Sequence, residues 1–179
     1  MEQLLDPRAQ RTRQLIIEAF NSLLQTRDFE KISIKDLTEM ATINRATFYA
    51  HFVDKYALLE AVLVETIQQT FARHLKEEDS LNAESIEQLF LAIVHLHDDM
   101  YAGCRRGYNT FTSMIEEKTK DEIVLQLQQL APTLPIESAT MLSWALYGSY
   151  VQWYKTSKEM PVQFVQRIMP HLLLFVAEV

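Results

Sequence analysis

Apolar side chains recur along most of the chain at the spacing of an α-helix, in which positions i, i+3, i+4 and i+7 share one face. The first stretch of this kind carries its apolar face at Ile16, Ala19, Phe20 and Leu23. A later stretch repeats a large apolar residue every four positions, at Leu59, Leu63, Ile67, Phe71 and Leu75. No segment shows the sustained alternation that is typical of a strand, so the sequence predicts an all-α protein.

Local start signals place the first four helices. Asp6-Pro7 is typical of an N-cap followed by proline at the first helical position. Ser33 and Asn44 are good N-caps in front of short apolar patterns, and Asp54 precedes the four-residue repeat. Only Thr42-Ile43 separates the two short patterns, and this spacing predicts a tight helix-turn-helix corner.

Helical spacing continues after a polar break at residues 77–82. It predicts helices around residues 86–97, 108–117, 121–130 and 137–156, and a last helix from Pro161 that Pro170 should kink. The prediction is about nine helices in two domains. Residues 1–55 form a three-helix headpiece with the helix-turn-helix, residues 56–179 form a larger helical domain, and a helix from about residue 54 connects the two.

The composition is that of an ordinary globular protein, with 179 residues, 48% hydrophobic and 23% charged. The formal net charge is −7, but residues 1–60 hold 8 Lys and Arg against 9 Asp and Glu, while residues 61–179 hold 9 against 15. The acidity is therefore concentrated behind the headpiece. This distribution argues against non-specific coating of DNA or of an anionic membrane, and it permits a reader of specific sites.

Cellular location is indicated by what the sequence lacks. Cys104 is the single cysteine, so no internal disulfide is possible. The amino terminus has no basic and apolar segments of a signal peptide, and no apolar run is long enough to span a bilayer. We expect a cytoplasmic protein without membrane contact.

The helix expected after Asn44 has the chemistry of a DNA-reading helix. Helical geometry places Arg45, Ala46, Tyr49 and, obliquely, Thr47 on one exposed surface. Its core side carries Phe48 and Phe52. Arginine pairs with guanine in the major groove, a small residue allows close approach, and a tyrosine hydroxyl reaches phosphate. Short helices with an exposed tyrosine also occur as plain packing units, so residue types alone leave both interpretations open.

Residues 34–59, which read IKDLTEMATINRATFYAHFVDKYALL, resemble the signature of the tetracycline-repressor (TetR) family. Its most specific part is the run Tyr49-x-His51-Phe52-x-x-Lys55 directly after the helix-turn-helix. The first predicted helix, with Thr12-Arg13 in front of its apolar face, is similar to the first helix of that family. The resemblance implies a dimeric transcriptional regulator with a DNA-binding headpiece and a helical ligand-binding domain.

The resemblance also implies residue roles. Base edges would be faced by Lys35, Arg45, Ala46 and Thr47. Phosphates would be contacted by Thr12, Ser33, Tyr49, His51 and Lys55. Other roles stay open: His51 could merely cap or pack at the end of its helix, and Lys55 could be a solvated lysine at a helix start. Two positions depart from the family, because Thr42 stands where a turn glycine is usual and Asp28 where a glycine follows the first helix.

The carboxy-terminal part has no signature of comparable specificity. His97 continues an apolar stripe, either as a core histidine with a hydrogen-bond partner or as a ligand contact. A pocket lined by His97 could also include aromatic and methionine side chains, each of which could equally be an ordinary core residue. These are Tyr101, Tyr108, Phe111, Met114, Trp144, Tyr147 and Tyr150. His95 and Asp99 share a helix face but do not make a metal site, and we expect no metal and no cofactor. A redox role for Cys104 beside Arg105-Arg106 would need a resolving partner.

The helix at 137–156 is apolar on more than one side, with small residues at Ala145, Gly148 and Ser149. We therefore expect a homodimer joined through residues 137–178. The predicted function is a ligand-responsive dimeric regulator, a repressor rather than an activator, that binds a palindromic double-stranded operator and is released by an unknown small molecule. The alternative is a TetR-like co-activator that acts through a protein partner. An enzyme is disfavoured because no nucleophile-base, metal or phosphate-loop pattern is present.

Overall fold

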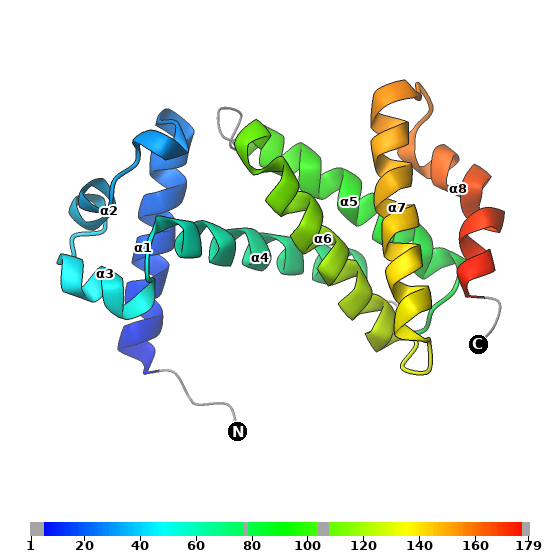
Figure 1. Ribbon diagram of the computed structural model, residues 1–179, viewed down its shortest axis with the longest axis horizontal. Coiled ribbons are helices and arrows are strands. Elements are labelled where there is room, and N and C mark those ends of the chain that lie inside the picture. The colour runs from blue at the N-terminus through cyan, green and yellow to red at the C-terminus, as the bar shows by residue number, and fades with distance from the viewer. Residues whose placement is uncertain (1–5, 77–78, 104–107, 177–179) are drawn as a thin grey trace. The chain divides into compact units, whose positions relative to one another are not determined.

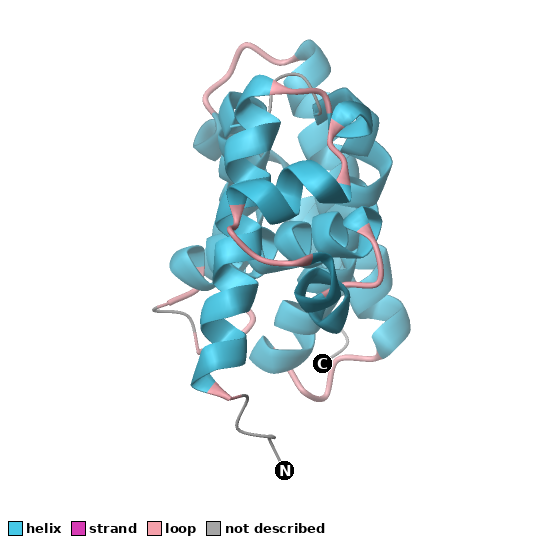
Figure 2. Ribbon diagram, turned by 90° about the vertical axis from the view of Figure 1, so that its left-hand side faces the viewer, coloured by secondary structure: helices cyan, strands magenta, loops and turns pink. Residues whose placement is uncertain are grey.

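The structure is a computed structural model that describes residues 6–76, 79–103 and 108–176. Every regular element in these residues is a helix, as Figure 1 and Figure 2 show, which confirms the predicted all-α class. The elements are α1 Pro7–Thr26, η1 Phe29–Lys31, α2 Ile34–Met40, α3 Arg45–His51, α4 Lys55–His74, α5 Ala83–Gly103, α6 Tyr108–Leu130, α7 Ile136–Thr156, α8 Pro161–Leu172 and η2 Leu173–Phe175, where η marks a 3-10 helix. None of the described helices is both long and apolar enough to cross a membrane.

The four start signals read from the sequence are confirmed. Side chains of Asp6, Ser33 and Asn44 cap α1, α2 and α3 by accepting a backbone N–H in the first turn. The side chain of Asp54 accepts two such N–H groups at the start of α4, each at 2.8 Å. These bonds satisfy donors that have no partner inside a helix, so the boundaries follow from residues close in the chain.

One predicted break is wrong. The spacing of apolar residues predicts separate helices at 108–117 and 121–130, whereas α6 runs without interruption through both. The stretch between them contains no glycine or proline, and Lys120 pairs with Glu116 one turn earlier at 2.9 Å. The described part of the chain therefore has eight α-helices instead of about nine.

One compact unit consists of residues 1–63 together with 100–111, as far as these are described. Its fully buried side chains include Ile16, Phe20, Leu37 and Phe48, which fixes α1, α2 and α3 around one core. The ring of Phe29, in η1, makes edge-on contacts with Phe20, Tyr56 and Phe111 at centroid distances of 6.1, 5.2 and 5.1 Å. Aromatic edge-to-face pairs of this kind add to the energy of area burial.

The second unit consists of residues 64–99 and 112–179, of which residues 77, 78 and 177–179 are not described. Its core is formed by fully buried apolar side chains such as Phe71, Ile86, Leu89, Phe90, Ile93, Leu142 and Leu146. The two units part within α4, between Leu63 and Val64, whereas the sequence analysis places the domain boundary near residue 55. The functional division into domains stays a prediction.

His97 lies inside the second unit with 4% of its surface exposed. Its Nε2 lies 3.2 Å from the hydroxyl of Tyr147, and its ring stacks on Tyr150 with the centroids 4.4 Å apart. Burial lowers the pKa of His97 to about 4, against the attraction of Glu116, which raises it. The imidazole is therefore neutral at pH 7.

This burial makes the stability of the second unit sensitive to pH. Because the pKa of His97 is lower in the folded than in the unfolded protein, the unfolded chain binds more protons between about pH 6.5 and pH 4. As the pH is lowered from about 6.5 to about 4, the free energy of unfolding should therefore decrease by up to about 1.4 kcal/mol for each pH unit. In a His97→Gln variant, urea unfolding at a series of pH values should show a smaller slope. Part of the slope should remain, because burial also lowers the pKa of His74, and an unchanged slope would contradict the assignment to His97.

The hydroxyl of Thr119 is buried, and no hydrogen-bond partner is found for it in the described residues. A buried hydroxyl without a partner costs free energy, and valine has the same shape without that group. Thr119→Val should therefore raise the free energy of unfolding by about 1 kcal/mol in urea denaturation. Ser143 is the matched control, because its buried hydroxyl donates to the Lys120 carbonyl at 3.1 Å. Ser143→Ala should lower stability, and equal effects of the two changes would contradict this account.

Candidate nucleic-acid interface

The corner between α2 and α3 closes through two backbone hydrogen bonds. The Thr42 N–H donates to the Glu39 carbonyl at 3.3 Å, and the Ile43 N–H donates to the Thr38 carbonyl at 3.0 Å. This is the Schellman pattern, which requires a left-handed residue after the helix. Thr42 has a φ of 55°, the one positive value among the described non-glycine residues. The corner thus keeps the conformation that glycine favours, at a cost of about 1–2 kcal/mol for a side chain with a Cβ.

The surface of α3 has the predicted division into an exposed side and a buried side. Arg45, Ala46 and Tyr49 are exposed, with Tyr49 at 49%, and Thr47 is half-buried. Phe48 is fully buried and anchors the helix. The hydroxyl of Thr47 donates to the Asn44 side chain at 3.0 Å, so it already belongs to the cap. The exposed part of α3 therefore consists of a guanidinium group, the methyl groups of Ala46 and Ala50, and a phenol.

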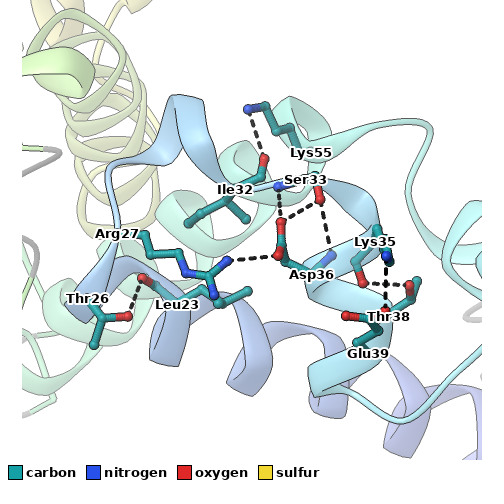
Figure 3. Close-up of polar contacts among 10 residues, drawn as sticks. All are labelled: Leu23, Thr26, Arg27, Ile32, Ser33, Lys35, Asp36, Thr38, Glu39 and Lys55. Atoms are coloured by element: carbon teal, nitrogen blue, oxygen red, sulfur yellow. Dashed lines mark hydrogen bonds and ion pairs between the residues drawn. The ribbon is translucent and has the colours of Figure 1, made fainter.

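The start of α2 is held by a polar cluster shown in Figure 3. Asp36 accepts hydrogen bonds from the hydroxyl of Ser33, from the Ser33 N–H at 2.9 Å, and from Nη1 of Arg27 at 2.8 Å. The hydroxyl of Ser33, the Ser33 N–H and Arg27, in that order, lower the pKa of Asp36 to about 2. Lys35, one residue into the helix, stays exposed and lies 3.7 Å from Glu39.

The remaining predicted phosphate contacts differ in how free their polar groups are. Thr12 is half-buried and donates its hydroxyl to the Arg8 carbonyl at 2.9 Å. His51 is half-buried at the end of α3, with its ring 6.5 Å from that of Phe52. Lys55 donates to backbone carbonyls of another segment instead of projecting freely into solvent.

Sequence reasoning missed the partners of Arg27 and Lys55. Arg27 had the pattern of a simple surface charge, yet it bonds Asp36 across nine residues. Lys55 reaches carbonyls 23 to 26 residues earlier. No short motif in the sequence signals such pairs, because they form only when α1, α2 and α4 pack.

The predicted ligand-binding residues are not brought together as one lining. His97, Tyr147 and Tyr150 form the buried cluster described above, while Phe111 packs on Phe29 in the first unit. Tyr101 is exposed and Met114 half-buried, and the side chain of Tyr108 and Cys104 lie outside the described residues.

Trp144 is 61% exposed on α7, and the ammonium of Lys120 lies 3.4 Å from the centre of its indole ring. Both residues border an open hollow of about 370 Å³ together with Leu125 and Ser143. A cation over an indole face is a favourable contact, so this pair fixes α6 and α7 at their surface. Trp144 therefore belongs to the outside of the second unit, and the same ammonium lies 5.9 Å from the ring centre of Tyr147 in the buried cluster.

The family model described as "Bacterial regulatory proteins, tetR family" matches residues 16–62. A curated relative, the uncharacterized HTH-type transcriptional regulator YxbF of Bacillus subtilis (strain 168), is 32% identical over 96 residues. That match covers 53% of this chain and 25% of YxbF, so the chain spans about a quarter of that relative's length.

Solved structures match over nearly the whole chain. The TetR family repressor AlkX from Dietzia sp. strain DQ12-45-1b, implicated in biodegradation of n-alkanes, aligns with a TM-score of 0.57 and 17% identity, covering 95% of this chain and 97% of AlkX. The flavonoid-responsive regulator FrrA aligns with a TM-score of 0.58 and 16% identity, covering 92% and 96%. At such identities the likeness shows a shared fold. Residues 16–62 thus carry the helix-turn-helix of the tetR family of bacterial regulatory proteins, whose members are transcriptional regulators and not enzymes, and the chain as a whole shares the fold of TetR family structures.

Proposed function

We propose that this protein is a homodimeric, ligand-responsive transcriptional repressor that acts in the cytoplasm. It binds a palindromic operator through α2 and α3 and leaves it when a small molecule binds. The observation that carries the DNA-binding part is the surface of α3, where Arg45, Ala46 and Tyr49 are exposed on a helix that Phe48 anchors in the core. A guanidinium group beside a small residue can enter the major groove and pair with guanine.

The contacts divide into two chemical kinds. The base edges face Lys35, Arg45, Ala46 and Thr47. The phosphates face Thr12, Ser33, Tyr49 and His51. Among these, Lys35, Arg45 and Tyr49 have the most exposed polar groups, whereas the hydroxyls of Thr12, Ser33 and Thr47 must share the hydrogen bonds they already make.

The dimer forms through residues 137–178, of which 177 and 178 lie outside the described residues. On α7, Met141 and Trp144 are 52% and 61% exposed, and two large apolar side chains three residues apart on one helix offer a surface on which a partner could pack. Between α7 and α8 lies an open groove of about 610 Å³, bordered by the small residues Ala145, Gly148 and Ser149. A helix of a second copy fits such a groove, and two copies would build a four-helix bundle around a two-fold axis.

The effector site lies in the second unit. The buried cluster of His97, Tyr147 and Tyr150 offers aromatic faces with a few polar atoms, which suits a neutral aromatic molecule better than an anion. The acidic balance of residues 61–179 also disfavours anions. That FrrA is described as flavonoid-responsive and AlkX as a repressor supports ligand response and repression in a protein of this fold.

The DNA-binding proposal is tested by selection from a pool of random duplexes. The purified protein should enrich an inverted repeat whose half-sites are spaced by about one helical turn, ~34–36 Å. Arg45→Ala should lower affinity for the selected duplex by about 1–3 kcal/mol and relax the preference at one or two base pairs. The measurement is fluorescence anisotropy at several salt concentrations.

Lys31→Ala provides the control, because Lys31 is exposed in η1 and pairs with Asp28 at 2.6 Å, away from α3. It should leave the base preference unchanged. Enrichment of no sequence, or an Arg45→Ala variant that keeps the parental affinity and preference, would contradict the proposal.

The dimer is tested at Gly148. A Cβ at this position would meet nothing within 4 Å among the described residues of its own chain, and the position borders the open groove, which has room for a larger side chain. Gly148→Leu should therefore fold but block close approach of the partner helix, shifting the protein to monomer in sedimentation velocity at ~10 μM. Gly148→Ala is the matched control, because it gains the same helix propensity with little added bulk. A monomeric parent, or a Gly148→Leu variant that dimerises like the parent, would contradict this interface.

A further inference from the structure

Lys55 is the first residue of α4, and its ammonium group lies among backbone oxygens of the segment between α1 and α2. Its Nζ is 3.1 Å from the carbonyl of Phe29, 3.2 Å from that of Glu30 and 3.1 Å from that of Ile32. The bond to Ile32 is drawn in Figure 3. An ammonium group has three N–H donors, and here each of them has a carbonyl acceptor.

The surroundings suit a fixed cation. The carbonyls belong to the 3-10 helix η1 and the residue after it, and carbonyls at the end of a helix carry partial negative charge. The ring of Phe29, 2% exposed, lies below the ammonium with its centre 4.5 Å from Nζ. Cation and ring attract each other, so Lys55 is held from both sides.

The position of these carbonyls links Lys55 to the helix-turn-helix. Ile32 is directly followed by Ser33, the N-cap of α2. The bond from Lys55 to Ile32 therefore joins the first residue of α4 to the residue before α2. On the other side of the same N-cap, Arg27 at the end of α1 bonds Asp36.

We propose that Lys55 is a positioning residue for DNA binding: it fixes the start of α2 relative to α4, and it acts through the placement of the helix-turn-helix instead of contacting phosphate itself. This rests on the proposed function, in which α2 and α3 read DNA. A phosphate contact would require the ammonium to leave its carbonyls, and three backbone acceptors would then lose a charged donor.

The experiment compares Lys55→Met, which keeps the stem and removes the donors, with Lys55→Arg, which keeps the charge. A planar guanidinium spreads its donors in a fork and cannot direct them at three carbonyls around one point, yet it binds phosphate well. Lys31→Met is the control for the loss of a lysine elsewhere in this segment. Each variant is unfolded in urea without DNA, and its affinity is measured for the selected duplex and for a scrambled duplex of equal length, under conditions where circular dichroism shows it folded.

We expect Lys55→Met and Lys55→Arg both to lower the urea midpoint. Both should weaken binding to the selected duplex by about tenfold or more while changing binding to the scrambled duplex little, because the reading surface is misplaced. The slope of log affinity against log salt should stay that of the parent, since no phosphate contact is lost.

Two results would overturn the proposal. If Lys55→Met weakens both duplexes, lowers the salt slope by about one unit and is rescued by arginine, Lys55 contacts phosphate. If the folded variants bind both duplexes like the parent, Lys55 has only a structural role. If the parent prefers no duplex, the proposed function fails instead. Urea unfolding then still tests whether the bonds from Lys55 to the three carbonyls stabilise the fold, and an unchanged midpoint in Lys55→Met would overturn the proposed positioning role.

Discussion

A helix of seven residues does not hold together alone in water, because its few hydrogen bonds do not offset the cost of ordering the backbone. Both α2 and α3 have this length, so the groups at their ends and on their buried sides decide where they lie. Leu37 and Phe48 supply the buried anchors, and both are fully inaccessible. The orientation of the exposed guanidinium of Arg45 is thus a consequence of packing around the first unit's core.

At the start of α2, charged hydrogen bonds fix the position of the helix in addition to the packing of its buried side. Asp36 receives hydrogen bonds from Ser33 and from Arg27, the residue that ends α1. The low pKa of Asp36 reflects these bonds and keeps the carboxylate ionised at neutral and mildly acidic pH. Lys55, the first residue of α4, bonds the carbonyl of Ile32 directly before this N-cap, so contacts from two long helices locate the start of α2.

Much of this arrangement could be predicted from the sequence, and the reason is distance along the chain. Caps at Asp6, Ser33 and Asn44 depend on residues two or three positions away, and so does the division of α3 into exposed and buried sides. The partners of Arg27 and Lys55 depend on contacts with other helices, which no local pattern contains. The ligand candidates show the same limit, since helical spacing identifies apolar faces without telling which of several faces is covered. His97 and Tyr147 meet inside the second unit, whereas Trp144 on the same helix as Tyr147 remains exposed.

The left-handed conformation of Thr42 has a consequence for motion. A branched side chain at a φ of 55° is tolerated only while the Schellman bonds and the buried faces of α2 and α3 hold it. Local opening of the corner releases that strain, so the free energy of opening is smaller there than for the same corner with glycine. Amide hydrogen exchange at Ile43, whose N–H closes the motif, therefore reports how often the two short helices part. Contact with DNA on both helices would slow that exchange, so the exchange rate of this amide measures the local stability of the packing between α2 and α3.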